Sequence, residues 1–271
     1  QRILEMYENI EIPAPAEGEW SKHIGKDITD PKADSSAAFA QFSTEYVKNT
    51  RKHYYAAVTF IDEQVGRIVK ALKEKGMYDN TIICFTSDHG DMMGDHHSWR
   101  KTYAYEGSAA IPMIIKTPKD VEGVHCRGKV IENPVELRDI LPTFLDAAGG
   151  ETPEAMDGRS MLKLIKEENP QWRRWIDMEH ATCYSEENYW CALTDGKIKY
   201  IWFLRTGEEQ LFDLVKDPHE TVNQITNRKY RKQTDELRRA MAEHLSERGD
   251  KWVKDGQLQK REKTLLYSPN Y

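Results

Sequence analysis

The sequence predicts an α/β fold followed by a smaller antiparallel β-sheet subdomain. In the first part of the chain, a long segment with one apolar stripe at helical spacing precedes a short turn and an apolar run at residues 81–87. In the second part, short aromatic-rich runs are separated by turn signals. Helix, turn and buried strand form one half of a parallel α/β unit, whereas short runs joined by tight turns are typical of an antiparallel sheet.

The long helical segment covers residues 53–76. Its apolar residues recur at intervals of three and four, which places them on one helix face. They are Val58, Ile61, Val65, Ile68, Val69 and Leu72. Gly76 is suited to end this helix because glycine readily adopts the left-handed conformation after the last turn. The run at 81–87, TIICFTS, shows no alternation, so we expect a strand covered on both faces.

Further elements are expected on both sides of residue 170. Up to that point they are strands at 112–118 and 128–131 and helices at 136–150 and 157–165. Pro142 is compatible with the first of these helices because it falls in the first turn. Beyond residue 170 we expect antiparallel strands at 175–184, 189–195, 197–204 and 209–214, and a charged helix at 227–248. The pair Asp195-Gly196 marks a hairpin. We therefore expect two domains, at 1–170 and 171–271.

Composition excludes several classes of function. The 271 residues carry a net charge of −6, from 39 basic and 45 acidic side chains, so there is no basic footprint for nucleic acid. No run of 18 apolar residues predicts a membrane span. The chain opens with Gln1 in an irregular, proline-marked segment, and we expect that an N-terminal portion is missing.

Six acidic and histidine residues crowd the ten positions directly behind the expected strand at 81–87. Asp88 and His89 come first, at the place where open α/β sheets bind ligands. A carboxylate oxygen and an imidazole nitrogen suit a divalent cation. Asp-His-Gly is also a good turn sequence, so the local pattern leaves a structural role open. Two neighbouring residues cannot complete a coordination sphere, so further ligands must come from elsewhere.

The stretch SDHGDMMGDHHSWRKTYAYEGSAAIPMIIKTP resembles the C-terminal signature of the sulfatases in the alkaline-phosphatase superfamily. The matching parts are Asp88-His89-Gly90, Gly94-Asp95-His96, Lys101, Tyr105-Glu106-Gly107 and Ile111-Pro112. The flanking segments YYAAVTFIDEQVGRIVKALKEKGMYDNT and VELRDILPTFLDAAGGETPEAMDGRSM are also similar, and EQLFDLVKDPHETVNQ resembles a late motif of the family. The resemblance runs over nearly the whole chain. It implies an alkaline-phosphatase-like mixed or parallel central sheet flanked by helices.

The resemblance also implies roles for individual residues. Asp88 and His89 would be two ligands of a catalytic divalent ion, usually Ca²⁺, with Mg²⁺ or Mn²⁺ as alternatives. Lys101 would contact the sulfate and the leaving-group oxygen as the catalytic cation. These residue types fit the chemistry, because positive charge offsets the negative oxygens of a sulfate ester and helps an alkoxide to leave. Without the motif, the simpler interpretation of Lys101 is a solvent-exposed lysine in a loop.

Three histidines are candidates for substrate binding. His96 and His97 lie in the crowded loop, where one of them would line the pocket or serve as a general acid; a structural hydrogen-bonding role is the alternative. His180 lies in the antiparallel part, where related enzymes contribute substrate contacts. Its alternative is an ordinary strand histidine.

The family's nucleophile motif is absent from the sequence. Sulfatases of this type form a formylglycine from the Cys or Ser of a Cys/Ser-x-Pro/Ala-x-Arg motif, and none of the four cysteines lies in one. The family's N-terminal Asp-Asp ligand pair is missing as well. We therefore expect a C-terminal fragment that is inactive alone and whose partner is the N-terminal half of the same protein.

The expected function of the full-length protein is hydrolysis of sulfate esters, on a sulfated carbohydrate or an aryl alcohol. One alternative is a phosphonate monoester or phosphodiester hydrolase of the same superfamily. Another is a catalytically incomplete binding or assembly module. The expected location is periplasmic or secreted, with a cytoplasmic location as the alternative.

Overall fold

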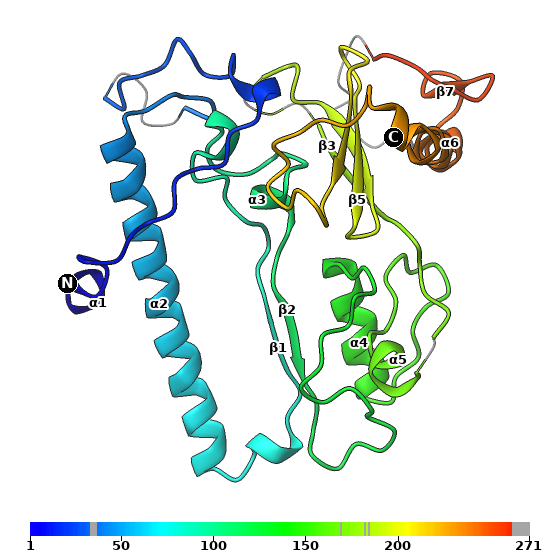
Figure 1. The fold of residues 1–271 in the computed structure, drawn as a ribbon. Coiled ribbons are helices and arrows are strands. Elements are labelled where there is room, and N and C mark those ends of the chain that lie inside the picture. Colours follow the sequence, from blue (N-terminus) through cyan, green and yellow to red (C-terminus); the bar gives the residue numbers. More distant parts are fainter. Residues whose placement is uncertain (33–36, 169, 182, 184, 262–271) are drawn as a thin grey trace. The chain divides into compact units, whose positions relative to one another are not determined.

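A 31-residue helix and a four-stranded antiparallel sheet are the two largest elements of the chain (Figure 1). The structure is a computed structural model, and it describes residues 1–32, 37–168, 170–181, 183 and 185–261. Its contacts divide the chain into two units. Unit 1 comprises Gln1–Lys101 and Gly107–Val121, and unit 2 comprises Thr102–Glu106 and Glu122–Tyr271. Residues 122–170 thus group with the antiparallel sheet, while the domain boundary near residue 170 stays a prediction for the whole protein.

The long helix of unit 1 is α2, Thr44–Glu74. It confirms the helix predicted over 53–76 and begins about two turns earlier. Ser43 caps its first turn, because its hydroxyl accepts a hydrogen bond from the backbone N–H of Tyr46. Gly76 follows the last turn with a φ of 66°, as predicted from its lack of a Cβ.

The two strands of unit 1 correct a prediction. Strands β1 (Ile83–Thr86) and β2 (Met113–Lys116) pair antiparallel, with Phe85 opposite Ile114. No parallel sheet forms among the described residues. A parallel pair needs a crossover, usually a long helix, but the segment between these strands holds only short helical turns, including α3 (Glu106–Ala109).

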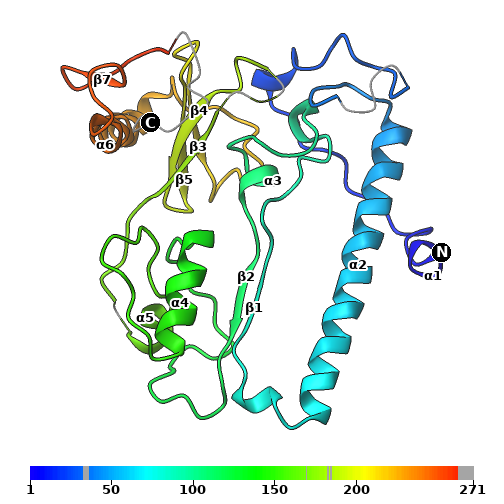
Figure 2. The same cartoon turned by 180° about the vertical axis from the view of Figure 1, so that it is seen from behind.

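The faces of this strand pair are also less covered than predicted. Phe85 is 38% exposed and Ile114 is 62% exposed, so the described residues do not bury the strands on both sides. On α2 the apolar stripe is equally open, with Val58, Ile61 and Ile68 each more than half exposed. Figure 2 shows the pair β1–β2 and α2 from behind. The other short elements of unit 1 are α1 (Arg2–Glu5) and the 3₁₀ turns Glu19–Ser21, Tyr78–Asn80 and Asp95–His97.

Unit 2 is built on the predicted antiparallel sheet, whose strand order is β3-β4-β5-β6. The strands are β3 (Ile176–His180), β4 (Trp190–Thr194), β5 (Ile198–Phe203) and β6 (Glu209–Asp213). The predicted Asp195-Gly196 hairpin joins β4 to β5, and Gly196 has a φ of 81°. Helix α6 (Arg231–Ser246) closes one face of the sheet, close to the helix predicted at 227–248.

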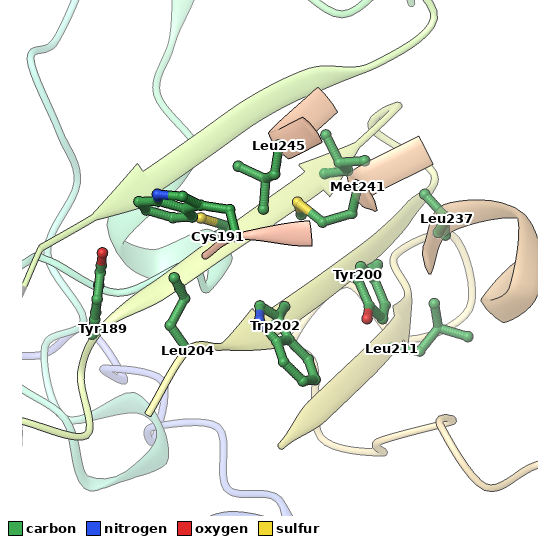
Figure 3. Packing of buried hydrophobic residues seen from close by; sticks show 11 residues of the cluster. Tyr189, Cys191, Tyr200, Trp202, Leu204, Leu211, Leu237, Met241 and Leu245 are labelled. Atoms are coloured by element: carbon green, nitrogen blue, oxygen red, sulfur yellow. The ribbon is translucent and has the colours of Figure 1, made fainter. Parts of the chain in front are cut away.

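The core of unit 2 lies between this sheet and α6 (Figure 3). Tyr200 and Leu211 from the sheet and Leu237, Met241 and Leu245 from the helix are each at most 1% exposed. The α6 residues recur at intervals of four, so they share the helix face that meets the strands. This burial fixes the sheet as a rigid platform.

The remaining elements of unit 2 include one correction. Residues 128–131 form no strand; Gly128 lies in a turn with a φ of 70° and Val130 is 91% exposed. A run this short has too little apolar surface to fix a strand on its own. The predicted helices appear as α4 (Ile140–Ala147), preceded by a 3₁₀ turn at Leu137–Asp139, and as α5 (Leu162–Lys166). A 3₁₀ turn at Arg228–Tyr230 and the small hairpin β7 (Val253–Lys254) and β8 (Gln257–Leu258) complete the unit. No helix in the described residues is long and apolar enough to cross a membrane.

Candidate active site

Asp88 and His89 follow β1 directly and face one another. His89 Nε2 lies 3.4 Å from Asp88 Oδ2, and both side chains are accessible, with exposed fractions of 41% and 82%. The Asp88 carboxyl accepts the backbone N–H of His89, and this hydrogen bond holds the pKa of Asp88 below its usual range. The carboxylate is therefore ready to bind a cation.

The imidazole of His89 is oriented by its other nitrogen. Nδ1 lies 2.7 Å from the carbonyl oxygen of Gly90, so Nδ1 donates there and Nε2 is the ring nitrogen that faces Asp88. Metal-binding histidines commonly use a carbonyl in this way to fix the ring and its tautomer. The donor set of this pair, one carboxylate and one oriented imidazole, thus fits a divalent cation.

The pair supplies only part of a coordination sphere. No group of three or more His, Cys, Asp or Glu side chains in the described part of the chain is arranged to hold a metal ion. Asp91 and Asp95, the other acidic residues of this loop, accept hydrogen bonds from the loop backbone and from Arg51, respectively. The sequence prediction that Asp88 and His89 need further ligands stays a prediction.

Gly90 allows the loop behind the pair to pack against α3. Its N–H donates to the carbonyl of Ser108 at 2.9 Å, and a Cβ at this position would lie 2.2 Å from the carbonyl oxygen of Gly107. A side chain here cannot fit without moving the backbone. The glycine of the Asp-His-Gly motif is therefore required by this close approach.

The loop between His89 and Lys101 is tied together by Asp91. Its Oδ1 accepts the backbone N–H groups of Met93 at 2.9 Å and Arg100 at 3.1 Å. Met92 N–H also donates to the Arg100 carbonyl at 2.7 Å. The two ends of the loop are thus held together, which brings the main chain at Lys101 back towards the Asp88-His89 end.

Arg51, on α2, anchors the tip of the same loop. It is 6% exposed and donates to Met93 O at 2.9 Å and, through Nη2, to the carboxylate of Asp95. Asp95 Oδ1 also accepts the N–H of Ala16 at 2.8 Å, and Arg51 Nη1 reaches the carbonyl of Pro13 at 3.1 Å. One buried guanidinium therefore joins the helix, the loop and the N-terminal segment.

His96 and His97 occupy different surroundings. His96 is 2% exposed with its ring centroid 4.6 Å from that of Trp20, which favours the structural alternative. His97 lines a cavity of about 390 Å³ with Trp99. Its Nε2 lies 3.9 Å from the carboxylate of Glu17. Substrate binding by either histidine stays a prediction.

Lys101 is the last residue of the first segment of unit 1 and is half-buried. Its side chain forms no ion pair with another described residue. His180, in unit 2, stacks on Trp190 with ring centroids 6.1 Å apart, and its Nδ1 contacts the carbonyl of Ala181. Its role in substrate binding also stays a prediction.

Comparison with known proteins agrees with these motifs. The profile of the sulfatase family matches residues 20–150, and a profile described as N-sulphoglucosamine sulphohydrolase, C-terminal, matches residues 94–247. An arylsulfatase of Clostridium perfringens is 38% identical over 263 residues, which cover 95% of this chain and 52% of that protein. The chain thus spans about half the length of the curated relatives it matches.

Solved structures support the same fold. The phosphonate monoester hydrolase of Silicibacter pomeroyi is 28% identical, with a TM-score of 0.71 over 89% of this chain and 52% of that one. An enzyme solved with its substrate D-glucosamine-2-N,6-O-disulfate is 23% identical, with a TM-score of 0.69 over 90% of this chain and 61% of that one. The latter likeness concerns the fold alone. With two profiles that together span most of its length, the chain belongs to the sulfatase family of the alkaline-phosphatase superfamily.

Proposed function

We propose that this chain is the C-terminal part of a sulfatase that hydrolyses sulfate esters. The observation that carries the proposal is the Asp88-His89 pair, with Nε2 and Oδ2 3.4 Å apart, at the start of the loop that ends at Lys101. An oriented pair of metal ligands and an ammonium group can supply the positive charge that hydrolysis of an anionic ester requires.

Asp88 and His89 would hold a divalent cation, with Ca²⁺ as the first candidate and Mg²⁺ or Mn²⁺ as alternatives. Bound there, the ion would supply positive charge to the sulfate oxygens. Lys101 would bind a sulfate oxygen and the bridging oxygen. As the S–O bond breaks, negative charge grows on the leaving oxygen and the ammonium group stabilises it.

The nucleophile of this reaction would come from outside the chain. No cysteine or serine of the sequence lies in a Cys/Ser-x-Pro/Ala-x-Arg motif, so we propose a formylglycine, and the remaining metal ligands, in a preceding segment. The chain alone is then expected to show no turnover. Its partner would be that N-terminal half, and the proposed location of the whole protein is periplasmic or secreted.

The substrate would be a sulfated carbohydrate or an aryl sulfate. One relative is named an N-acetylglucosamine-6-O-sulfatase and another an arylsulfatase, which supports each class. Phosphonate monoester or phosphodiester hydrolysis is the second candidate, supported by the likeness to a phosphonate monoester hydrolase.

A direct comparison of substrates separates these candidates. We expect the full-length protein to hydrolyse p-nitrophenyl sulfate with a kcat/KM at least about tenfold above that for p-nitrophenyl phenylphosphonate, a difference of about 1.4 kcal/mol. Equal or faster phosphonate hydrolysis would overturn the sulfatase proposal. If the native reading frame has no Cys/Ser-x-Pro/Ala-x-Arg before Gln1, the binding or assembly module becomes the better proposal.

A further inference from the structure

Lys101 is followed by a residue in a strained backbone conformation. Thr102 has a φ of 91°, and Arg100, on the other side of Lys101, has a φ of 68°. Positive φ is uncommon for any residue with a side chain and is an outlier for a β-branched one. Such a conformation persists only where the surrounding structure holds it, and strained residues of this kind gather at functional sites.

Two buried side chains hold Thr102 in this conformation. The side-chain amide of Asn188 lies 3.2 Å from the Thr102 carbonyl oxygen and 3.1 Å from its hydroxyl oxygen. The indole Nε1 of Trp190 donates to the same carbonyl at 2.9 Å. The carbonyl thus accepts two hydrogen bonds, and the amide also lies 3.3 Å from the carbonyl of Cys183.

Both donors belong to the rigid part of unit 2. Asn188 is 6% exposed and Trp190 is 5% exposed. Trp190 is the first residue of β4, a central strand that pairs with β3 and β5. If either donor were lost, the Thr102 carbonyl would lose one of its two hydrogen bonds to a buried side chain, at a cost in free energy. The two donors therefore fix the position of this carbonyl.

The segment that begins at Thr102 is also fixed at its other end. The N–H of Glu106 donates to Glu220 at 2.6 Å, and the fully buried ammonium of Lys199 lies 2.6 Å from Glu106 and 2.8 Å from Glu220. The Tyr105 hydroxyl donates to Gln210 at 2.9 Å. Residues 102–106 therefore have little freedom to move.

We propose that Asn188 and Trp190 are positioning residues for Lys101. By holding the Thr102 carbonyl, they fix the direction in which the main chain leaves Lys101, and hence the backbone position from which its side chain starts. The inference rests on the proposed function, in which Lys101 contacts the sulfate and the leaving oxygen. Neither residue touches the substrate in this account.

The kinetic test uses the full-length protein and two aryl sulfates. Asn188→Ala should lower kcat for p-nitrophenyl sulfate about 10- to 100-fold with little change in KM, because a misplaced cation fails mainly in the transition state. The loss of kcat should be larger for phenyl sulfate. Its leaving group is poorer, so its departure depends more on stabilisation by the Lys101 ammonium group. Trp190→Phe removes the indole donor and part of the ring while keeping an aromatic side chain, and it should show the same pattern.

A double variant links the effect to Lys101. In a Lys101→Ala background, Asn188→Ala should cause no further loss of kcat, since a positioning residue acts only through its target. Independent losses that multiply would overturn the proposal, as would a wild-type kcat in Asn188→Ala. The matched control is Asn223→Ala, which removes hydrogen bonds to the N–H groups of Leu211 and Ile225. It should lower Tm without changing the dependence on leaving group.

A second measurement does not depend on turnover. Glycine adopts a positive φ without strain, so Asn188→Ala should lower Tm less in a Thr102→Gly background than in the wild type. Thr102→Gly should also restore part of the kcat lost in Asn188→Ala. Additive Tm changes would overturn the claim that Asn188 holds Thr102. Absence of wild-type turnover with both sulfate and phosphonate esters would instead overturn the proposed function.

Discussion

The absence of a side chain at Gly90 determines the backbone geometry of the candidate site. The turn behind Asp88 and His89 brings the Gly90 backbone against that of Gly107, with room for a hydrogen atom and nothing larger. His89 Nδ1 depends on the same turn because it donates to the Gly90 carbonyl. The geometry of the Asp88-His89 pair is therefore set by a residue that carries no functional group.

We predict that Gly90→Ala lowers both stability and metal binding. A Cβ 2.2 Å from the Gly107 oxygen forces the backbone to shift, at a cost of about 1–3 kcal/mol in the free energy of unfolding. Urea unfolding and the affinity for Ca²⁺ measure the two effects in the full-length protein.

The matched control is Gly66→Ala on α2, where no atom lies within 4 Å of the added Cβ. Helix propensity predicts a gain of about 0.5–1 kcal/mol there, with no change in metal affinity. Equal effects of the two substitutions would contradict the structural account of Gly90.

The sequence allowed some candidate site residues to be proposed and not others. Asp88, His89 and Lys101 lie within one short motif, so their spacing was visible along the chain. Asn188 and Trp190 were missed because they meet Thr102 across 86 and 88 positions, through the pairing of β4 with its neighbours. Donors to a strained carbonyl leave no local pattern in the sequence.

The same contrast holds for the elements. Helix α2 and the four strands of unit 2 were predicted because a long apolar stripe and turn-separated aromatic runs are strong local signals. The parallel pairing expected of the central sheet does not form among the described residues, where β2 pairs antiparallel with β1. Strand direction depends on the path of the intervening segment, and that path has no periodicity. Residues 128–131 had too few apolar side chains to hold a strand.

The junction of β6 with the start of α6 gives a prediction on pH. Burial alone would raise the pKa of Asp213, but hydrogen bonds from Lys216 and from the Tyr230 hydroxyl, at 2.5 and 2.6 Å, outweigh it and lower this pKa to about 2. A pKa lowered on folding stabilises the protein above the unfolded value of 3.8, and this contribution is lost as the pH falls towards 2.

Tyr230→Phe should therefore destabilise the protein most at neutral pH. Its effect on the free energy of unfolding should shrink as the pH falls from about 4 to about 2, because a protonated Asp213 no longer gains from the hydroxyl. Urea unfolding across this range measures it. The control is Tyr7→Phe, which loses a hydrogen bond to the neutral hydroxyl of Thr59 at 2.6 Å and should show no such pH dependence. A pH-independent effect of Tyr230→Phe would contradict the assignment.

For the molecule as a whole, the proposed function assigns one part of an active site to the described residues. Unit 1 carries the ligand pair and Lys101, and unit 2 holds the segment that follows Lys101. Several apolar side chains of α2 and β2 are exposed, including Ile61, Ile68 and Ile114. They lie on the elements that the sequence assigned to the α/β part of the fold. The chain spans about half of its curated relatives, so the reaction itself is assigned to the full-length protein as a proposal.

Steady-state hydrolysis of p-nitrophenyl sulfate tests the claim that Asp88, His89 and Lys101 belong to a sulfatase active site. We predict turnover by the full-length protein with Ca²⁺, and a loss of kcat/KM of at least about 10²-fold in each of Asp88→Ala, His89→Ala and Lys101→Ala, about 2.7 kcal/mol or more of transition-state stabilisation. Chelation of the metal should abolish turnover in the wild type. Variants that fold as the wild type does and keep its kcat/KM would contradict the claim.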